Sequence, residues 1–312
     1  MTKTLLFNRI AFIGFGLIGS SLARVIRREG LADRVVACAR SEATRQAALD
    51  LALADSVTED PAEAVEDADL IVLCTPVGAY ETIAKSIGPN IKQDAIVTDV
   101  GSVKRVVIDL VRPYLSPEVH LVPGHPIAGT ENSGPEAGFE SLFEDRWVIL
   151  TPPSDTSSYA IEKVAELWRR TGSKIEIMDA DHHDQVLALT SHVPHLIAYT
   201  IVGTATDLED VLKSEVIKFA ASGFRDFTRI AASDPVMWRD IFLHNRGAVL
   251  EMLGRLTEDI SALQRAIRDG DGAYMEDKFT RTRAIRRDVV EARQHIPPEP
   301  PGTPKRPFSD QT

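Results

Sequence analysis

The stretch RIAFIGFGLIGSSLARVI, residues 9–26, decides the fold class. Its first residues, RIAFI (9–13), form a short and mostly apolar run, which is typical of a buried strand. The glycine-rich turn GFGLIG (14–19) follows directly and leads into a helical pattern. A G-x-G-x-x-G sequence between a strand and a helix indicates a dinucleotide-binding turn. The alternative is a glycine-rich turn that serves packing alone.

Each glycine of this turn has its own predicted role. Gly14 permits the tight turn, Gly16 lets a pyrophosphate approach the backbone, and Gly19 lets the helix pack closely on the strand. The N-terminus of the helix then presents unpaired N–H groups and a partial positive charge to the phosphates. The predicted phosphate-binding residues are therefore Gly14, Gly16, Leu17, Ile18 and Gly19.

Apolar runs alternate with helical patterns through about the first 180 residues. Continuous apolar strands separated by helices indicate a parallel sheet with helices on both faces. We therefore predict a doubly wound, Rossmann-type α/β domain over residues 1–180. The expected strands are RIAFIG (9–14), RVVACA (34–39), ADLIVLCTP (68–76), AIVTDV (95–100), HLVPGH (120–125) and KIEIMD (174–179).

The second part of the chain shows long amphipathic runs, which predict an all-helical domain over residues 181–294. The helical runs are 181–203, 208–221, 234–268 and 272–294. The tail, residues 295–312, is Pro-rich and polar and is expected to be disordered. A long apolar stripe in the third run exceeds what one helical domain can bury, which predicts a homodimer. The stripe consists of Val236, Ile241, Leu243, Val249, Leu250, Leu253, Leu256, Ile260 and Leu263.

The composition disfavours several kinds of partner. The chain has 312 residues, with 35 Lys and Arg against 46 Asp and Glu, and its formal charge of −11 argues against nucleic acid. No apolar run approaches the roughly 20 residues of a transmembrane helix, so no membrane association is expected. Cys38 and Cys74 lie in apolar runs, which indicates buried, reduced thiols and a cytoplasmic protein.

The end of the second predicted strand bears on the choice of cofactor. NAD sites usually place an acidic residue there to accept hydrogen bonds from the ribose hydroxyls, but this chain has Ala39. We therefore favour NADP over NAD, with Arg40 binding the 2′-phosphate and Ser41 and Thr44 as further donors. The alternative is that Arg40 is merely solvated. Three more residues at strand ends are predicted to lie beside the cofactor, namely Thr75, Pro76 and Gly101.

Four later segments are more specific. They are TDVGSVK (98–104), PGHPIAGTENSG (123–134), SHVPH (191–195) and GFRDFTR (223–229). In this order they resemble the prephenate and arogenate dehydrogenases of tyrosine biosynthesis. Two overlapping stretches, GTENSGPEAGF (129–139) and LALTSHVPHLIAY (187–199), are most similar to the cyclohexadienyl dehydrogenase branch. The resemblance implies oxidative decarboxylation of prephenate to 4-hydroxyphenylpyruvate, or of arogenate to tyrosine. It also implies reduction of NAD(P)⁺ and a dimer formed through the helical domains.

The same resemblance assigns roles to two catalytic residues and one carboxylate-binding residue. His125 matches the catalytic histidine, which accepts the proton of the substrate hydroxyl. Ser102 matches the serine that hydrogen-bonds this histidine, although a helix N-cap is an alternative role for it. Arg229 matches the arginine that binds a substrate carboxylate, and an ion pair with Asp226 is its alternative.

Further residues are expected around the substrate. His195 is implied to contact substrate or cofactor, and Thr130 and Glu131 to line the substrate pocket. Glu131 is our candidate partner for the ammonium group of arogenate. Trp238 is interpreted as a core residue, and His182 and His183 as partly solvated residues at a helix start. No metal site is predicted, because His192 and His195 have no third ligand in the sequence.

Two other functions stay open at this stage. One is a dehydrogenase of the β-hydroxyacid type, which also joins a Rossmann domain to a helical domain. That class typically places a catalytic lysine on the helical domain, and Lys213 and Lys218 do not lie in a helix of that kind. The other is a protein that binds NADP without catalysis, for which His125, Ser102 and Arg229 would have no use together.

Overall fold

The computed structural model describes residues 5–130, 132–206 and 218–291. Its main sheet has six parallel strands in the order β3-β2-β1-β4-β5-β6. The strand order reverses between β1 and β4, and the glycine-rich turn follows β1, as in doubly wound dinucleotide-binding domains. The strands are β1 (Phe7–Ile13), β2 (Ala32–Cys38), β3 (Ser56–Thr58), β4 (Leu70–Leu73), β5 (Ile96–Asp99) and β6 (His120–Val122). The predicted fold class is confirmed.

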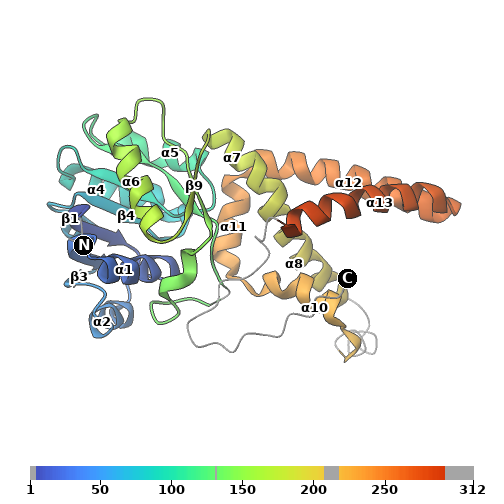
Figure 1. Cartoon of the computed structure of the whole chain (residues 1–312), viewed down its shortest axis with the longest axis horizontal. Helices are drawn as coiled ribbons and strands as arrows, with labels where there is room; N and C mark the ends of the chain where they lie inside the picture. The colour runs from blue at the N-terminus through green and yellow to red at the C-terminus, as the bar shows by residue number, and fades with distance from the viewer. Residues whose placement is uncertain (1–4, 131, 207–217, 292–312) are drawn as a thin grey trace.

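Helices cover both faces of this sheet (Figure 1). Alternate residues of β1 point to opposite faces, so Ile10 and Phe12 join one core cluster while Ala11 and Ile13 join the other. The first cluster includes side chains of α1 (Leu17–Glu29) and α6 (Ser158–Arg170), and the second those of α4 (Tyr80–Ile87) and α5 (Arg105–Val111). The short helices α2 (Glu42–Asp50) and α3 (Pro61–Ala64) complete this half of the chain.

A second, three-stranded sheet was not predicted. It contains β7 (Gly124–Pro126), β8 (Trp147–Leu150) and β9 (Lys174–Ile177), with β7 antiparallel to β8 and β8 parallel to β9. The single strand predicted at 120–125 is therefore wrong, because the chain leaves the main sheet after β6 and enters the small sheet at β7. Pro123 separates the two strands, since proline has no N–H to continue a ladder.

The helical half begins after β9. A continuous helical stretch consists of α7 (Ala180–Leu187), a π-helical turn (Ala188–His192) and α8 (Val193–Thr206). The α-helices that follow are α10 (Ser222–Thr228), α11 (Pro235–His244), α12 (Arg246–Asp269) and α13 (Gly272–Glu291), and a 3₁₀ helix, Arg229–Ala232, directly follows α10. Helices α12 and α13 pack together and extend away from the body of the molecule (Figure 1).

Two of the predicted helical runs are interrupted in the structure. The run predicted at 181–203 is one helical stretch, although its middle is π-helical. The run predicted at 208–221 lies mostly outside the described residues. The run predicted at 234–268 is divided at Asn245, whose buried side chain donates to the carbonyl of Asp184, 2.8 Å away. This side-chain contact fixes the corner between α11 and α12.

One helix departs from the expectation about membranes. The stretch Ala180–Ala205 has 26 residues, and an 18-residue window within it has a mean hydropathy of 1.4, so by length and composition it is long and apolar enough to span a bilayer. Its position favours a different role, because it packs against α12 and brings the buried His183 and Asp184 into contact with the other half. These contacts attach one side of the helix to the protein, and 28% of its apolar window is buried within the described residues.

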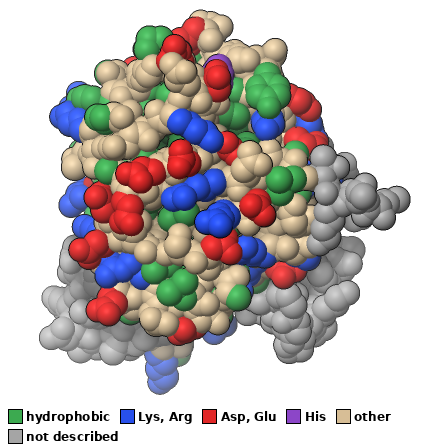
Figure 2. Space-filling view, turned by 90° about the vertical axis from the view of Figure 1, so that its left-hand side faces the viewer, with side chains coloured by type: hydrophobic (Ala, Val, Ile, Leu, Met, Phe, Trp, Pro, Cys, Tyr) green, Lys and Arg blue, Asp and Glu red, His purple; other side chains and the backbone are tan. Residues whose placement is uncertain are grey.

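The surface of the sheet-containing half has no uniform charge on the face in view. Figure 2 shows basic and acidic side chains interspersed over this face. Because nucleic-acid binding requires a basic surface, this face is unsuited to it.

A buried ion pair joins the two sheets. Lys104 and Asp99 are almost fully buried, and the ammonium Nζ lies 2.5 Å from the carboxylate Oδ2. Nζ also donates to the carbonyl of Gly124 on β7, 2.7 Å away, and the Gly124 N–H donates to the other oxygen of Asp99. Desolvation lowers the pKa of Lys104, and the charge of Asp99 opposes that shift. These hydrogen bonds hold the end of β5 against β7.

We expect Lys104→Met to destabilise the protein strongly, because it leaves the carboxylate of Asp99 buried without its cation. The loss should be about 3–5 kcal/mol, the usual cost of removing one partner of a buried ion pair. Urea unfolding monitored by circular dichroism measures it. The matched control is Lys92→Met, which breaks the partly exposed pair with Asp69 and should cost about 0–1 kcal/mol. Equal losses for the two variants would contradict the assigned role of Lys104.

Candidate active site

The glycine-rich turn has the geometry that a phosphate site requires. Gly14 has a φ of +90°, and a Cβ there would lie 2.8 Å from Cγ2 of Thr75 and 2.9 Å from the carbonyl carbon of Cys74. A Cβ on Gly19 would lie 3.3 Å from the carbonyl oxygen of Gly14, so the helix approaches the turn closely. A Cβ on Gly16 would meet no atom within 4 Å. Gly14 and Gly19 are therefore constrained by the protein itself, whereas Gly16 borders open space.

The N-terminus of α1 is free to meet an anion. Gly16 is its N-cap, Leu17 and Ile18 begin its first turn, and this turn has neither a side-chain cap nor an acidic residue. The hydroxyl of Thr75 is buried and has no hydrogen-bond partner in the described chain. Free N–H groups, a partial positive charge and an unused hydroxyl are the features that a dinucleotide pyrophosphate fits.

The register of the main sheet brings the other predicted cofactor residues to the same edge. Ile13 pairs with Leu73, and Leu73 pairs with Asp99, so β1, β4 and β5 end at one level. Thr75 and Pro76 come after β4, and Gly101 after β5, with the Gly101 N–H donating to Asp99. These segments lie beside the glycine-rich turn, as the sequence predicted.

The segment after β2 contains a residue that sequence analysis missed. Arg40 is exposed, Ser41 occupies the N-cap position of α2, and Thr44 lies in its first turn. Arg45 donates to the carbonyls of Ala39 and Arg40, at 2.8 and 2.9 Å, and its guanidinium lies 3.5 Å from Glu59. Arg45 thus fixes the backbone that presents Arg40. The only signal for it in the sequence is a second arginine one turn into the helix.

His125 lies on β7, the edge strand of the small sheet, with a side chain that is 8% exposed. Its Nδ1 is 2.9 Å from Nε2 of His183, and its Nε2 forms no hydrogen bond with any described residue. Burial is the main cause that holds the pKa of His125 well below its usual value, and the charges of His183 and Lys104 act in the same direction. The imidazole is therefore neutral at pH 7 and able to accept a proton.

The interpretation of His183 as a partly solvated residue is wrong. His183 is fully buried, and its Nδ1 lies 2.8 Å from Oδ1 of Asp184. Its spacing from Ala180 and Leu187 places it on the face of α7 that packs inward, and this spacing was the available signal. His182, in contrast, is exposed as expected.

Ser102 does not occupy either position expected of it. Helix α5 begins at Arg105, so Ser102 is not its N-cap. Instead, the carboxylate of Asp184 accepts the N–H groups of Lys104 and Arg105, at 2.8 and 3.0 Å. In the described residues, the hydrogen bond of the His125 Nδ1 goes to His183 and not to Ser102. The backbone of Ser102 faces His192, whose pKa burial lowers to about 4.

The helical half contributes a histidine stacked on a tryptophan. The rings of His195 and Trp238 lie 3.6 Å apart and nearly parallel, and Nδ1 of His195 is hydrogen-bonded to the carbonyl of Ser191. Trp238 is buried as expected, yet its indole N–H has no partner in the described chain. Burial lowers the pKa of His195, and the positive charge of Arg229 lowers it further. The structure therefore places Arg229 within electrostatic reach of His195.

The loop after β7 is described in part. Thr130 is half-buried, and its hydroxyl accepts the N–H of Asn132. Glu131 lies outside the described residues. The cysteines Cys38 and Cys74 are free thiols, and no group of three His, Cys, Asp or Glu that could hold a metal occurs in the part of the chain described here.

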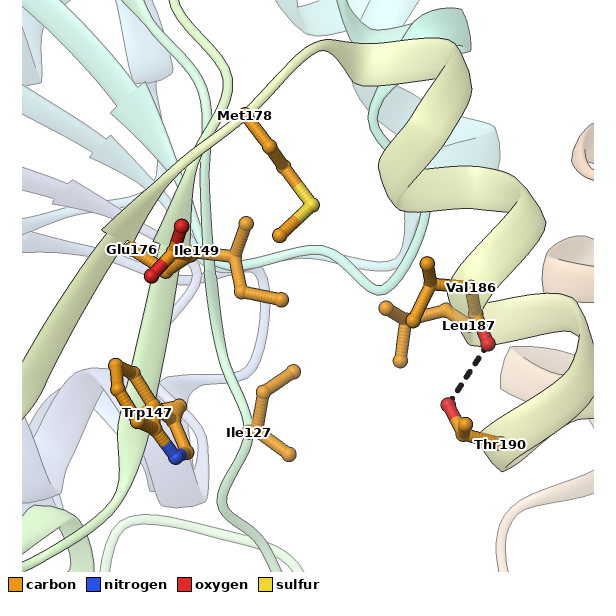
Figure 3. A pocket seen from close by; sticks show the side chains of 8 residues that line it. All are labelled: Ile127, Trp147, Ile149, Glu176, Met178, Val186, Leu187 and Thr190. Carbon is orange, nitrogen blue, oxygen red and sulfur yellow. Dashed lines mark hydrogen bonds between the residues drawn. The ribbon is translucent and has the colours of Figure 1, made fainter.

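An apolar pocket of about 250 Å³ lies between the small sheet and α7 (Figure 3). Its lining residues are Ile127, Trp147, Ile149, Glu176, Met178, Val186, Leu187 and Thr190. Glu176 is the only charged residue among them. A dicarboxylate needs cations around it, so this pocket is unsuited to such a substrate.

The two glycines of the turn allow a sharp test of the phosphate site. Gly16→Ala should fold normally, because the new methyl group meets no protein atom, but it should weaken cofactor binding by intruding on the open space. Gly14→Ala should instead destabilise the protein, because of its positive φ and the contacts with Thr75 and Cys74. Thermal unfolding and fluorescence titration with the reduced cofactor separate the two effects. Unchanged cofactor affinity in a folded Gly16→Ala protein would contradict this location of the site.

Comparison with known proteins agrees with this geometry. Residues 22–177 match the family profile "Prephenate dehydrogenase, nucleotide-binding domain", and residues 179–281 match "Prephenate dehydrogenase, dimerization domain". The chain is similar to the cyclohexadienyl dehydrogenase of Zymomonas mobilis, with 44% identity over 90% of this chain and 95% of that protein. It is 33% identical to the prephenate dehydrogenase of Bacillus subtilis, over 92% of this chain and 77% of that one.

A solved structure shows the same likeness in three dimensions. The prephenate dehydrogenase of Aquifex aeolicus, in complex with hydroxyphenyl propionate and NAD⁺, superposes with a TM-score of 0.85 at 33% identity. The match covers 90% of this chain and 98% of that chain.

Proposed function

The chain belongs to the prephenate dehydrogenase family, and from that premise we propose that it performs the oxidative decarboxylation of a cyclohexadienyl acid in tyrosine biosynthesis. The substrates are prephenate, which gives 4-hydroxyphenylpyruvate, and arogenate, which gives tyrosine. The observation that best supports this proposal is a buried, neutral His125 on β7, in contact with His183 of the helical half. A protein that only binds NADP would have no need for such a base.

The reaction requires two bonds to break at the ring. The glycine-rich turn would hold NAD(P)⁺, which would supply the acceptor for the hydride of the ring carbon that bears the hydroxyl group. His125 takes the hydroxyl proton as the hydride leaves, and the carbonyl forms. The ring carboxylate then leaves as CO₂, and its electron pair makes the ring aromatic. His125 returns its proton to the resulting phenolate, so the protein is unchanged. Because aromatisation drives the reaction, orientation matters more than the strength of the base.

We assign substrate binding to residues on both halves. Arg229 is the proposed partner of a substrate carboxylate, since its guanidinium can form two parallel hydrogen bonds. Its electrostatic effect on His195 supports a common position for the two residues. His195, held by Ser191 and Trp238, presents Nε2, and Thr130 and Ser102 line the remaining approach in this proposal. Glu131 remains our hypothesis for recognition of the arogenate ammonium group.

We propose NADP as the preferred cofactor, bound through Arg40, Ser41 and Thr44. The absence of an acid at Ala39 supports this choice, and Arg45 holds the backbone that presents Arg40. The relative from Aquifex aeolicus is in complex with NAD⁺, which makes a direct comparison of the two cofactors necessary.

We propose that the protein is a cytoplasmic homodimer formed through the helical half, residues 181–294. Exposed apolar side chains on α11 and α12 support this, because a monomer would leave them in water. They include Val236, Leu243, Leu250 and Ile260, at 48%, 63%, 59% and 52% exposed. Ile241 and Val249, from the same predicted stripe, are instead buried within the chain.

Initial rates with prephenate or arogenate, each with NAD⁺ or NADP⁺, test the function. We expect turnover, with a higher kcat/KM for NADP⁺ than for NAD⁺. Arg40→Ala should reduce kcat/KM with NADP⁺ by about 10- to 100-fold, the value of one charge-assisted interaction, and change it little with NAD⁺. An equal effect on both cofactors would contradict the role of Arg40. Absence of turnover in all four assays would contradict the proposed reaction.

His125→Asn should lower kcat by about 100- to 10,000-fold while KM changes little, because the variant binds substrate but has no base. The depressed pKa also predicts the pH profile. A base with a lowered pKa stays unprotonated as the pH falls through 6.5, so His125 should cause no loss of rate there. Stopped-flow assays from pH 5 to 9 measure this. A kcat that halves near pH 6.5 because of a single protonation of His125 would show that burial does not depress its pKa.

A further inference from the structure

We propose that His183 and Asp184 form a positioning pair that fixes the orientation and the tautomer of His125, so that its lone pair lies on Nε2. This inference rests on the proposed role of His125 as the proton acceptor. It concerns two adjacent residues of α7, which comes from the helical half, whereas His125 lies in the small sheet.

The three side chains form a continuous buried chain. Oδ1 of Asp184 lies 2.8 Å from Nδ1 of His183, and Nε2 of His183 lies 2.9 Å from Nδ1 of His125. The two imidazole rings meet edge to face, with centroids 5.1 Å apart. The exposed fractions are 5% for Asp184, 0% for His183 and 8% for His125. Bulk water therefore does not compete for these hydrogen bonds.

The hydrogen-bonding role of Asp184 follows from its other partners. Its Oδ1 accepts the backbone N–H of Lys104, and its Oδ2 accepts that of Arg105. Both carboxyl oxygens therefore already act as acceptors, and neither is placed to donate a proton to the ring of His183, 2.8 Å away. His183 accordingly donates from Nδ1.

The tautomer of each neutral ring then follows in turn. A neutral histidine that donates from Nδ1 has a bare Nε2, so His183 accepts at that nitrogen. His125 must therefore donate from its Nδ1, which leaves its own Nε2 unprotonated. This is the nitrogen without a hydrogen bond to any described residue, and hence the one available to a substrate hydroxyl. The opposite tautomer would place a proton on Nε2 and block general-base catalysis.

The hydrogen-bonded side chains of His183 and Asp184 also stabilise the positive charge that develops on His125 during the reaction. When His125 accepts a proton, the imidazolium keeps its Nδ1 hydrogen bond to His183, and the negative charge of Asp184 lies at the far end. The positive charge of Lys104 would oppose this, but Lys104 is paired with Asp99. His192 also faces this cluster, and its lowered pKa leaves it neutral.

The position of Asp184 depends on both halves of the molecule. Its side chain binds the start of α5, and its carbonyl accepts from the buried amide of Asn245, 2.8 Å away. The base on β7 is therefore oriented by a helix that is itself held from two sides. The hydrogen bonds that hold α7 in place therefore also orient His125.

Variants of two adjacent histidines test the proposal. His183→Leu should lower kcat by about 100-fold or more, as loss of an orienting partner does in catalytic triads, with KM and cofactor Kd within about two-fold. His183→Gln should restore at least about ten-fold of that loss, because its amide oxygen can accept from Nδ1 of His125. The matched controls are His182→Leu and His182→Gln, at the exposed neighbour on α7, and they should leave kcat unchanged.

A spectroscopic measurement on the unaltered protein tests the tautomer without relying on a variant's ability to fold. With ¹⁵N-labelled histidine and bound cofactor, the ring signals of His125 are identified by their absence in His125→Asn. We expect a protonated Nδ1 and a bare Nε2. A protonated Nε2, or a His183→Leu kcat within about three-fold of that of His182→Leu, overturns the proposal. A fully active His125→Asn would instead refute the assignment of His125 as the base, so the two failures are distinguishable.

Discussion

The buried carboxylate of Asp99 is the interaction on which the site depends. It lies at the end of β5 and accepts from four groups: Lys104, the hydroxyl of Tyr80, and the N–H groups of Gly101 and Gly124. Burying this charge is costly, and only a full set of donors offsets the cost. These donors come from α4, from the loop after β5, and from β7. One carboxylate therefore fixes the cofactor edge of the main sheet relative to the strand that presents His125.

A second carboxylate performs a similar task between the two halves of the chain. Asp184 takes the place of an N-cap for α5, although it is about 80 residues away in sequence. Through Asn245 and His192 the same region contacts the corner of α11 and α12. The helical half thus completes the site rather than merely covering it. In the proposed function the substrate contacts both halves, so the docking of the halves and the orientation of His125 would depend on the same hydrogen bonds.

The sequence predicted the features that depend on local patterns. The glycine-rich turn, the parallel strands and the segments at the strand ends all follow from spacing that a short window contains. Local spacing does not predict that residues 120–125 are divided between two sheets. Pro123 indicates that one strand ends there, but it does not indicate which strand β7 pairs with. The helical spacing of His183 from Ala180 and Leu187 indicates a shared face, but whether that face is buried depends on how α7 docks. The role of Arg45 was missed for the same reason. Its guanidinium donates to the carbonyls of Ala39 and Arg40, and only the folded loop brings these two groups within hydrogen-bonding distance.

The neutrality of His125 suits a reaction that is driven by aromatisation. Burial makes the proposed base, His125, weaker. That would be a disadvantage if the rate depended on how strongly the base binds the proton. The irreversible loss of CO₂ supplies the driving force, so the base needs only to be unprotonated, correctly turned and able to return its proton. Desolvation keeps His125 unprotonated, and the hydrogen bonds through His183 to Asp184 orient it. A weak base suits the third condition, because it holds the proton loosely enough to return it to the phenolate.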